Sequence, residues 1–351
     1  MLNSLRAAAL FIQNKIGWNR IGVFLSVAII ATAVVVLVRM LRGIDHNDVY
    51  TAVSATNPRH IAAAALFVAG GYFTLTFYDW FALRNIGHKE IPYRIAALAG
   101  FTSYSIGHNV GATVFTGGAV RYRIYSFYGL DAVEVAKICF LSGLTFWLGN
   151  VTVLGLGVSI HPEAAGAIDQ LPPLANRCIG FALLFILACY VGWVWSAPRE
   201  IGRGEWTVKL PHGPNTLLQI AIGIVDLTCC ALAMYMLLPS EPNIGFITVA
   251  VVFVSATLLG FASHAPGGLG VFDAAMLVAL WQFDKEHVLA GLLLFRVLYY
   301  LVPFALALTI LGIREVWLNM HGKHEKAELT AVRTVTAPIR TEIEARKTDA
   351  G

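Results

Sequence analysis

Long apolar runs recur along the whole sequence and constrain the fold more than any other feature. A helix needs about 20 consecutive, mostly apolar residues to cross the hydrocarbon core of a bilayer. Seven stretches approach or meet that requirement: 21–38, 61–83, 138–160, 178–195, 216–238, 244–262 and 288–312. Only 13% of the residues are charged and 57% are hydrophobic, whereas soluble domains carry about 25% charged residues. The chain is therefore expected to be a polytopic membrane protein.

The apolar runs also indicate which secondary structure crosses the membrane. Each run is continuously apolar, whereas the strands of a membrane barrel alternate over about ten residues. We therefore predict an all-α membrane helix bundle with about seven to nine spans. Residues 1–20 mix basic and apolar side chains, which is typical of an amphipathic interfacial helix. Residues 21–313 form the predicted transmembrane domain, and the charged tail 314–351 is predicted to be partly disordered.

The distribution of Lys and Arg over the connections predicts the orientation. Basic residues gather in 84–94, in 196–215 and in the tail, whereas 161–177 contains only Arg177 and 239–243 contains none. Cytoplasmic loops carry the excess of Lys and Arg. Both termini are therefore predicted in the cytoplasm of a bacterium, with the bundle in its inner (plasma) membrane. The basic connection 39–60 does not fit this rule.

Two segments interrupt the simple pattern of spans. The stretch 95–120 is apolar but contains five glycines, and 271–283 is apolar but, at thirteen residues, only about 20 Å long as a helix. Residues 107–123 and 263–273 each combine a Gly-Gly pair with polar residues. Irregular backbone at membrane depth is tolerated only where it is packed in protein or lines a wet cavity. We interpret both as re-entrant or interrupted helices; the alternative is a glycine-lined helix contact and an ordinary loop.

The positions of the two segments suggest a shared role. One interrupted segment in each half of a chain is typical of inverted-repeat transporters, and free N–H groups at helix ends attract anions. If 95–120 is a hairpin, Arg121 and Arg123 lie on the same side as the other basic loops. The alternative is a full span that leaves both arginines outside.

The residues of these segments resemble a known family. Asn109, Gly111, Gly117, Gly118, Arg121 and Arg123, followed by Ser263, Pro266, Gly267, Gly268, Gly270 and Phe272, are similar to the two signatures of the lysylphosphatidylglycerol synthase transmembrane-region family. That family includes the flippase half of the bacterial multiple peptide resistance factor. The resemblance, over roughly residues 20–315, implies a flippase-like helical fold that handles phospholipid, such as aminoacylated phosphatidylglycerol. The full resistance factor carries an aminoacyl-transferase domain after its membrane part, and no such domain follows here, so synthase activity is not expected.

Three charged residues lie inside the apolar runs: Asp79, Asp226 and Arg296. A charge at mid-bilayer costs about 2.5–3.5 kcal/mol on insertion scales, so such residues face the bundle interior and pair. We expect Asp226 and Arg296 to form a gate pair or to bind an ammonium headgroup; the alternative is an ion pair that only fixes packing. Asp79 is expected at the gate, or anchored at the interface beside Trp80 and Arg84.

The predicted lipid or phosphate site combines the two glycine-containing segments, because Arg forms bidentate bonds to phosphate oxygens. Its residues are Asn109, Gly117, Gly118, Arg121, Arg123, Ser263, His264, Gly267 and Gly268.

No motif for catalysis, a cofactor or a metal is present. The sequence lacks HExxH, a Walker loop, GxSxG and CxxC, and its five cysteines are expected to serve packing. The leading hypothesis is a phospholipid translocase without cofactors. Its expected partners are membrane phospholipid, the bilayer, a separate lipid-modifying enzyme and a second copy of the chain, but not nucleic acid. The alternatives are the membrane part of a lipid-modifying transferase and a scaffold that transports nothing.

Overall fold

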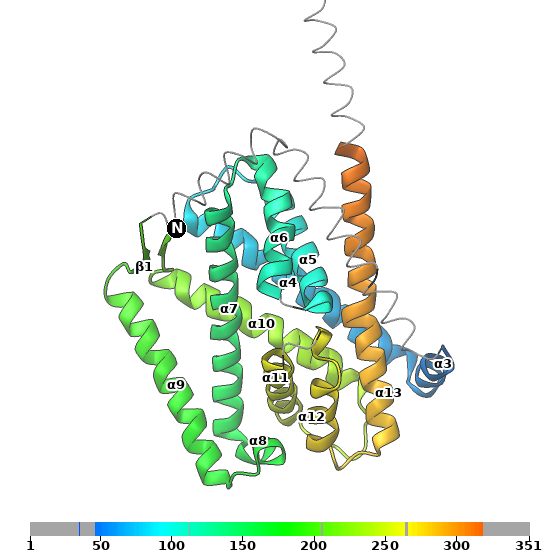
Figure 1. Ribbon diagram of the computed structural model, residues 1–351. Coiled ribbons are helices and arrows are strands. Elements are labelled where there is room, and N and C mark those ends of the chain that lie inside the picture. The colour runs from blue at the N-terminus through cyan, green and yellow to red at the C-terminus, as the bar shows by residue number, and fades with distance from the viewer. Residues whose placement is uncertain (1–34, 36–45, 112, 205, 264–265, 319–351) are drawn as a thin grey trace, which may run out of the picture. The chain divides into compact units, whose positions relative to one another are not determined.

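The computed structural model describes Val35 and residues 46–111, 113–204, 206–263 and 266–318 (Figure 1). These residues are mostly helical. The helices are α3 (His46–Ala55), α4 (Pro58–Ile86), α5 (Tyr93–Val110), α6 (Thr113–Tyr125), α7 (Ala132–Ile160), α8 (Pro162–Asp169), α9 (Pro173–Ser196), α10 (Pro214–Leu237), α11 (Phe246–Ala262), α12 (Val271–Ala279) and α13 (Lys285–Phe295). Short 3-10 turns η1 (Ser126–Tyr128) and η2 (Pro266–Gly268) follow α6 and α11, and the π-helical segment η3 (Arg296–Leu301) continues α13.

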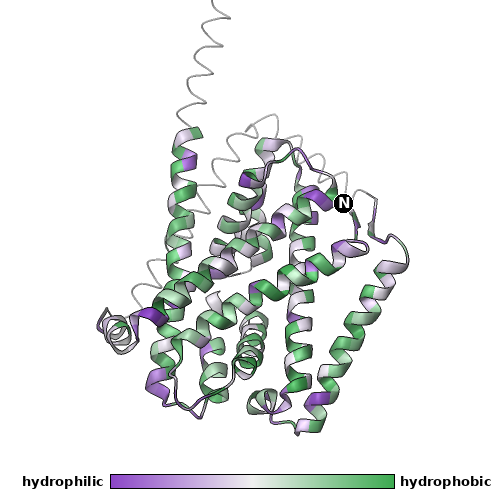
Figure 2. Cartoon of the chain, turned by 180° about the vertical axis from the view of Figure 1, so that it is seen from behind, coloured by the Kyte–Doolittle hydropathy of each residue, from purple (hydrophilic) through white to green (hydrophobic). Residues whose placement is uncertain are grey.

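The long helices confirm the predicted membrane bundle. Five described helices are long and apolar enough to cross a bilayer: Pro58–Ile86, Ala132–Ile160, Pro173–Ser196, Pro214–Leu237 and Lys285–Leu318. Helix α11, with 17 residues, corresponds to the predicted run 244–262. Hydrophobic residues run along most helices, and hydrophilic residues gather at helix ends and in connections (Figure 2). Apart from Val35, the predicted span 21–38 lies outside the described residues, as do the segment 1–20 and the tail beyond 318.

Two sets of connections define opposite ends of the bundle in residues 46–307. At the first, Asn85 Nδ2 donates a hydrogen bond to the Lys209 carbonyl at 2.6 Å, and His88 Nε2 lies 2.8 Å from Glu134 Oε1. This is the β-hairpin end. At the second, α8 packs against the start of α9, where Asn176 Nδ2 donates to the Pro162 carbonyl at 3.3 Å. This is the α8 end.

One element was not anticipated from the sequence. The connection 196–215 contains two antiparallel strands, β1 (Glu200–Arg203) and β2 (Trp206–Lys209), with Glu200 paired to Lys209 and Arg203 to Trp206. Glycines with positive φ, Gly202 at +116° and Gly204 at +61°, permit the tight return. Four-residue strands are too short to leave a clear alternating pattern in the sequence.

The segment 95–120 folds as a hairpin, as predicted, and not as one continuous span. Helices α5 and α6 pack against each other, and the chain reverses at Gly111, which has a φ of +83°. His88 precedes α5, and its bond to Glu134 in the first turn of α7 places the entry and the exit of the hairpin at the β-hairpin end. We call α5 and α6 the first hairpin.

The second interrupted segment forms a hairpin from the opposite end. Helix α11 starts at the α8 end, the chain turns through η2, and α12 runs back to pack against α8. Three glycines with positive φ, Gly267, Gly268 and Gly270, make this turn. We call α11 and α12 the second hairpin. The order of long helix, hairpin and long helix occurs twice, with the hairpins entering from opposite ends, as the predicted inverted repeat requires.

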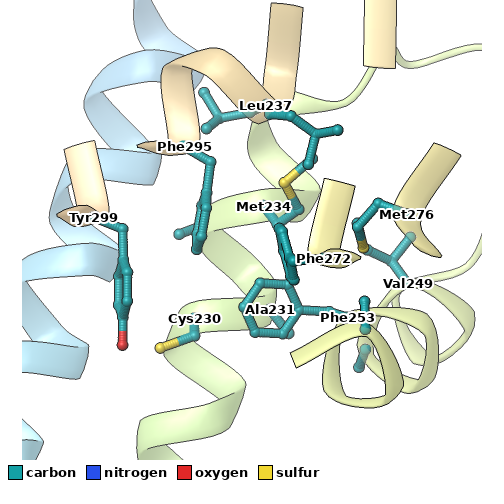
Figure 3. Packing of buried hydrophobic residues seen from close by; sticks show 14 of the residues in the cluster. Cys230, Ala231, Met234, Leu237, Val249, Phe253, Phe272, Met276, Phe295 and Tyr299 are labelled. Carbon is teal, nitrogen blue, oxygen red and sulfur yellow. The ribbon is translucent and has the colours of Figure 1, made fainter. Parts of the chain in front are cut away.

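The apolar core cluster draws most of its residues from α4, α10, the second hairpin and α13 (Figure 3). Phe253 and Phe272 meet edge to face at 5.6 Å between ring centres, and Phe295 stacks on Tyr299 at 5.1 Å. Met234 of α10 is fully buried in the same cluster. Through these ring contacts the second hairpin packs against η3. The position of the hairpin therefore determines where the two tyrosines of η3 lie.

Candidate functional site

A cavity of about 240 Å³ lies where the tips of the two hairpins meet. The tips approach closely, since a Cβ on Gly267 would lie 3.6 Å from the Tyr300 ring and 3.9 Å from the His108 carbonyl. The lining is mostly aromatic and apolar. It consists of Leu75, Tyr104, His108, Gly111, Thr113, Val114, Phe115, Phe146, Asp226, Leu227, Cys230, Phe253, Thr257, Gly260, Phe261, Gly267, Gly268, Phe272, Tyr299 and Tyr300.

Asp226 is the carboxylate of this cavity. It lies in the middle of α10 and is 4% exposed. Its Oδ2 accepts a hydrogen bond from the Tyr78 hydroxyl at 2.9 Å, and its Oδ1 lies 3.9 Å from Cys230 Sγ. Gly71 of α4 lies beside the carboxylate, and a Cβ there would be in ordinary van der Waals contact with Oδ1 at 3.7 Å. Among the described residues, no ion pair involves Asp226.

The other predicted acidic residue, Asp79, is bound to Arg121. Arg121 Nη2 donates to Asp79 Oδ1 at 2.7 Å, and its Nε lies 2.9 Å from Oδ2. The Tyr125 hydroxyl donates to the same carboxylate at 2.9 Å, and the guanidinium lies 4.9 Å from the centre of the Tyr104 ring. Both charged side chains are buried. This arrangement neutralises Arg121 and ties α6 of the first hairpin to α4.

Arg296 pairs with Asp273, so the predicted pair between Asp226 and Arg296 is wrong. Arg296 Nε donates to Asp273 Oδ1 at 3.1 Å, and its Nη2 donates to Oδ2. Asp273 also accepts a bond from the Gly270 backbone N–H at 3.0 Å. The physical reason is the packing of the second hairpin: α12 brings Asp273 against η3, while Asp226 faces α4 and the cavity.

Asn109 and Gly117 are predicted site residues that do not line the cavity. Asn109 is buried and donates to the Ser105 and Tyr300 carbonyls at 2.7 and 3.3 Å, and its Oδ1 has no described partner. Gly117 allows α6 to approach α5, because a Cβ would lie 3.2 Å from the Ser103 carbonyl.

Three further predicted residues do not line the cavity either. Gly118 faces Cys139, Arg123 lies with its guanidinium 4.7 Å from the centre of the Phe127 ring, and Ser263 Oγ donates to the Gly260 carbonyl at 2.6 Å. His264 lies outside the described residues. Of the predicted site, the structure brings Asp226, Gly267 and Gly268 together in the cavity.

Sequence reasoning missed the tyrosines of the site. Tyr78 donates a hydrogen bond to Asp226. Tyr72 donates to the Tyr299 carbonyl at 2.9 Å, and Asn109 donates to the Tyr300 carbonyl, so two carbonyls of η3 are bound by side chains. A π-helical turn is rare and occurs often at functional sites. The signal present in the sequence is the Tyr299-Tyr300 pair, which begins three residues after Arg296 inside an apolar run.

The described lining carries a carboxylate and no arginine. Arg121 and Arg296 are both held by carboxylates, and neither lines the cavity. The predicted phosphate-binding residues are therefore not gathered around one anion site within the described residues. Aromatic rings and a carboxylate instead provide the chemistry that binds organic ammonium groups.

Together these features define a polytopic helical membrane protein in which two hairpins from opposite ends enclose a central cavity. The chain belongs to the lysylphosphatidylglycerol synthase transmembrane-region family, whose sequence profile matches residues 23–307. The match covers both hairpins and confirms the resemblance seen in their glycine-containing segments.

Relatives agree with this membership. Over 269 residues the chain is 31% identical to the uncharacterized protein slr0712 of Synechocystis, covering 76% of this chain and 83% of that protein. It is 30% identical over 283 residues to the inner membrane protein YbhN of Escherichia coli, covering 78% and 86%. It is 25% identical over 304 residues to a phosphatidylglycerol lysyltransferase of Staphylococcus aureus, covering 85% of this chain but 34% of that enzyme.

Proposed function

We propose that this protein moves phospholipid between the two leaflets of a bacterial inner membrane. The observation that carries the proposal is the cavity at the meeting point of two hairpins that enter from opposite ends. Substrate sites of inverted-repeat transporters lie near the midplane, between interrupted helices of the two repeats. The headgroup passes through the cavity while the acyl chains stay in the surrounding lipid.

The lining indicates how the headgroup is recognised. Asp226 and the rings of Tyr104, Tyr299 and Tyr300 accept an ammonium group. Arg123, half-buried near the β-hairpin end, attracts the lipid phosphate. Arg121 acts differently, because its bonds to Asp79 make it a residue that positions the first hairpin.

Aminoacylated phosphatidylglycerol combines a phosphate with an ammonium group and fits this arrangement. The relative from Staphylococcus aureus is named as a phosphatidylglycerol lysyltransferase, and the chain spans about a third of that enzyme. The partner that makes such a lipid for this protein is a separate lipid-modifying enzyme.

The orientation follows from the basic residues. Arg199, Arg203 and Lys209 lie at or beside the β-hairpin, and Arg84 and Lys89 lie at the same end. The positive-inside rule places this end in the cytoplasm. Headgroups from the cytoplasmic leaflet therefore meet the first hairpin first.

Filling the cavity tests the function. Thr257 lines the cavity, so Thr257→Trp is expected to lower translocation of fluorescent phospholipid in proteoliposomes at least tenfold. Leu66→Trp, on an exposed face of α4, is the matched control and should keep the rate of the unsubstituted protein. A rate equal to that of empty vesicles for the unsubstituted protein, or equal rates for both variants, would contradict the proposal.

A further inference from the structure

Asp226 is a buried carboxylate surrounded by groups that carry no fixed positive charge. The titratable groups that face it are Tyr72 and Tyr78 from α4, Tyr104 and His108 from α5, Cys229 and Cys230 from α10, and Tyr299 and Tyr300 from η3. The neighbouring parts of α7, α11 and α12 contribute Phe146, Phe253, Thr257 and Phe272, none of which titrates. The Arg121 guanidinium lies 4.9 Å from the centre of the Tyr104 ring and is held by Asp79.

Two other carboxylates of the described residues, the buried Asp79 and the half-buried Asp273, differ from Asp226 because an arginine pairs with each. Asp79 and Asp273 each receive an arginine that donates two or more hydrogen bonds. An ionised carboxylate in an apolar site is strongly disfavoured unless a cation accompanies it. Asp226 therefore carries a proton when the cavity is empty, or it faces a cation that enters the cavity.

We propose that Asp226 exchanges its proton for the ammonium group of a ligand. When the ammonium group enters, the O–H bond of the Asp226 carboxyl breaks, its electron pair stays on the oxygen, and the proton leaves to water. The carboxylate and the ammonium group then form an ion pair, so the net charge in the cavity stays constant. When the ligand leaves, a proton from water restores the carboxyl group.

The geometry suits such an exchange. Tyr78 donates to Oδ2, and this hydrogen bond holds the carboxylate in place while Oδ1 changes partner. The rings of Tyr104, Tyr299 and Tyr300 line the same cavity, and aromatic rings attract ammonium groups. A primary ammonium group is small compared with a cavity of about 240 Å³.

The exchange would give the translocation proposed above a source of energy. Because one carboxylate binds either a proton or an ammonium group, each headgroup that moves in one direction is matched by a proton that moves in the other. This coupling rests on the proposed function, whereas the competition at Asp226 does not require transport.

Proton release measures the competition directly. The purified full chain in detergent, weakly buffered with a pH-indicating dye, is mixed with short-chain phosphatidylethanolamine, and release of about one proton for each bound lipid is expected. Short-chain phosphatidylglycerol, which has no amine, should release none. Free ethanolamine distinguishes a site for the amine alone from one that also needs the lipid.

The variants decide whether Asp226 is the source of the proton. Asp226→Asn keeps the acceptor for Tyr78 and should lower proton release at least tenfold, whereas Glu163→Gln, exposed in α8, should leave it unchanged. Equal release from Asp226→Asn and the unsubstituted chain would overturn the proposal.

A second measurement covers the case in which Asp226→Asn does not fold. For the unsubstituted chain, the Kd for phosphatidylethanolamine should rise about tenfold for each unit of pH below the midpoint of the titration, and a Kd independent of pH would overturn the proposal. Translocation without proton release would contradict the proposed proton exchange but not the proposed function. Proton release without translocation would contradict the proposed function but not the proton exchange.

Discussion

At the scale of single residues, two ion pairs, one buried and one half-buried, hold the hairpins in place. Arg121 on the first hairpin binds Asp79 on α4, and Asp273 on the second hairpin binds Arg296 on η3. In each case a hairpin helix is tied to a long helix of its own half. Breaking a buried pair leaves an unpaired charge inside the bundle, which is far more costly than removing both partners.

The pair of Asp79 and Arg121 allows a quantitative test. Asp79→Asn is expected to destabilise the protein by about 3–5 kcal/mol, because Arg121 then lacks its counter-charge. The double variant Asp79→Asn with Arg121→Gln should recover part of that loss. Thermal unfolding of the detergent-solubilised protein, followed for the wild type, both single variants and the double variant, measures the coupling. Losses that simply add in the double variant would show that the two side chains do not interact.

His88 at the β-hairpin end gives a prediction for pH. Partial burial acts to lower the pKa of His88, but its hydrogen bonds to Glu90 and Glu134 outweigh burial and raise the pKa above its ordinary value. The contact therefore stabilises the fold fully below the unfolded pKa of about 6.5, and the contribution is lost as pH rises through the raised folded value.

The variant His88→Gln isolates this contribution. The difference in thermal stability between wild type and His88→Gln should be largest near pH 6 and should shrink at alkaline pH, with a size of about 1 kcal/mol or less. Melting temperatures measured across that range check the sign. A difference that grows with increasing pH would mean that the neutral form of His88 makes the contact.

At the scale of elements, the crossing of α7 and α10 depends on two glycines. A Cβ on Gly149 would lie 2.7 Å from the backbone of Gly223, and a Cβ on Gly223 would lie 2.7 Å from the Thr145 carbonyl. Small residues let helix backbones approach closely in membranes. Next to the crossing, Gln219 donates to the Leu141 carbonyl at 3.2 Å and to Thr145 Oγ1 at 2.9 Å, so the approach also satisfies polar groups.

Substituting Gly223 tests the crossing. Gly223→Ala is expected to destabilise by about 1–3 kcal/mol, since the added methyl group meets backbone atoms that cannot move independently. Gly143→Ala in α7 meets nothing within 4 Å and should be neutral or stabilising by up to about 1 kcal/mol. Unfolding in detergent compares the two variants. Equal stability of Gly223→Ala and Gly143→Ala would show that the crossing tolerates a wider separation.

The elements also show what the sequence could predict. The long helices and both hairpins follow from local signals, namely apolar runs of sufficient length and glycines where the chain must turn at membrane depth. The ion pairs do not, because Arg121 and Asp79 are 42 positions apart and Arg296 and Asp273 are 23 apart. Their pairing depends on how the helices cross, and no local sequence pattern predicts a helix crossing. For the same reason the predicted pairing of Asp226 with Arg296 was wrong, and in the fold Asp226 instead accepts a hydrogen bond from Tyr78.

At the scale of the whole molecule, the cavity depends on hairpins that enter the bundle from opposite ends. Cys178 and Cys189 are exposed on α9, whereas the other three cysteines are buried or half-buried in α7 and α10. In a background with Cys178→Ser and Cys189→Ser, a membrane-impermeant maleimide should label introduced cysteines at exposed positions in the connections far more than the background chain. Lys89→Cys precedes the first hairpin, Tyr128→Cys follows it, and both positions are exposed.

The predicted labelling separates a hairpin from a full span. In sealed cells Lys89→Cys and Tyr128→Cys should both stay unlabelled until the membrane is opened, because the positive-inside rule places both in the cytoplasm. Asn243→Cys and Asp284→Cys, before and after the second hairpin, should both react in sealed cells. Labelling of Lys89→Cys and Tyr128→Cys from different sides would mean that 95–120 crosses the membrane. The cavity would then not lie between opposed tips, and the basis for translocation through it would be lost.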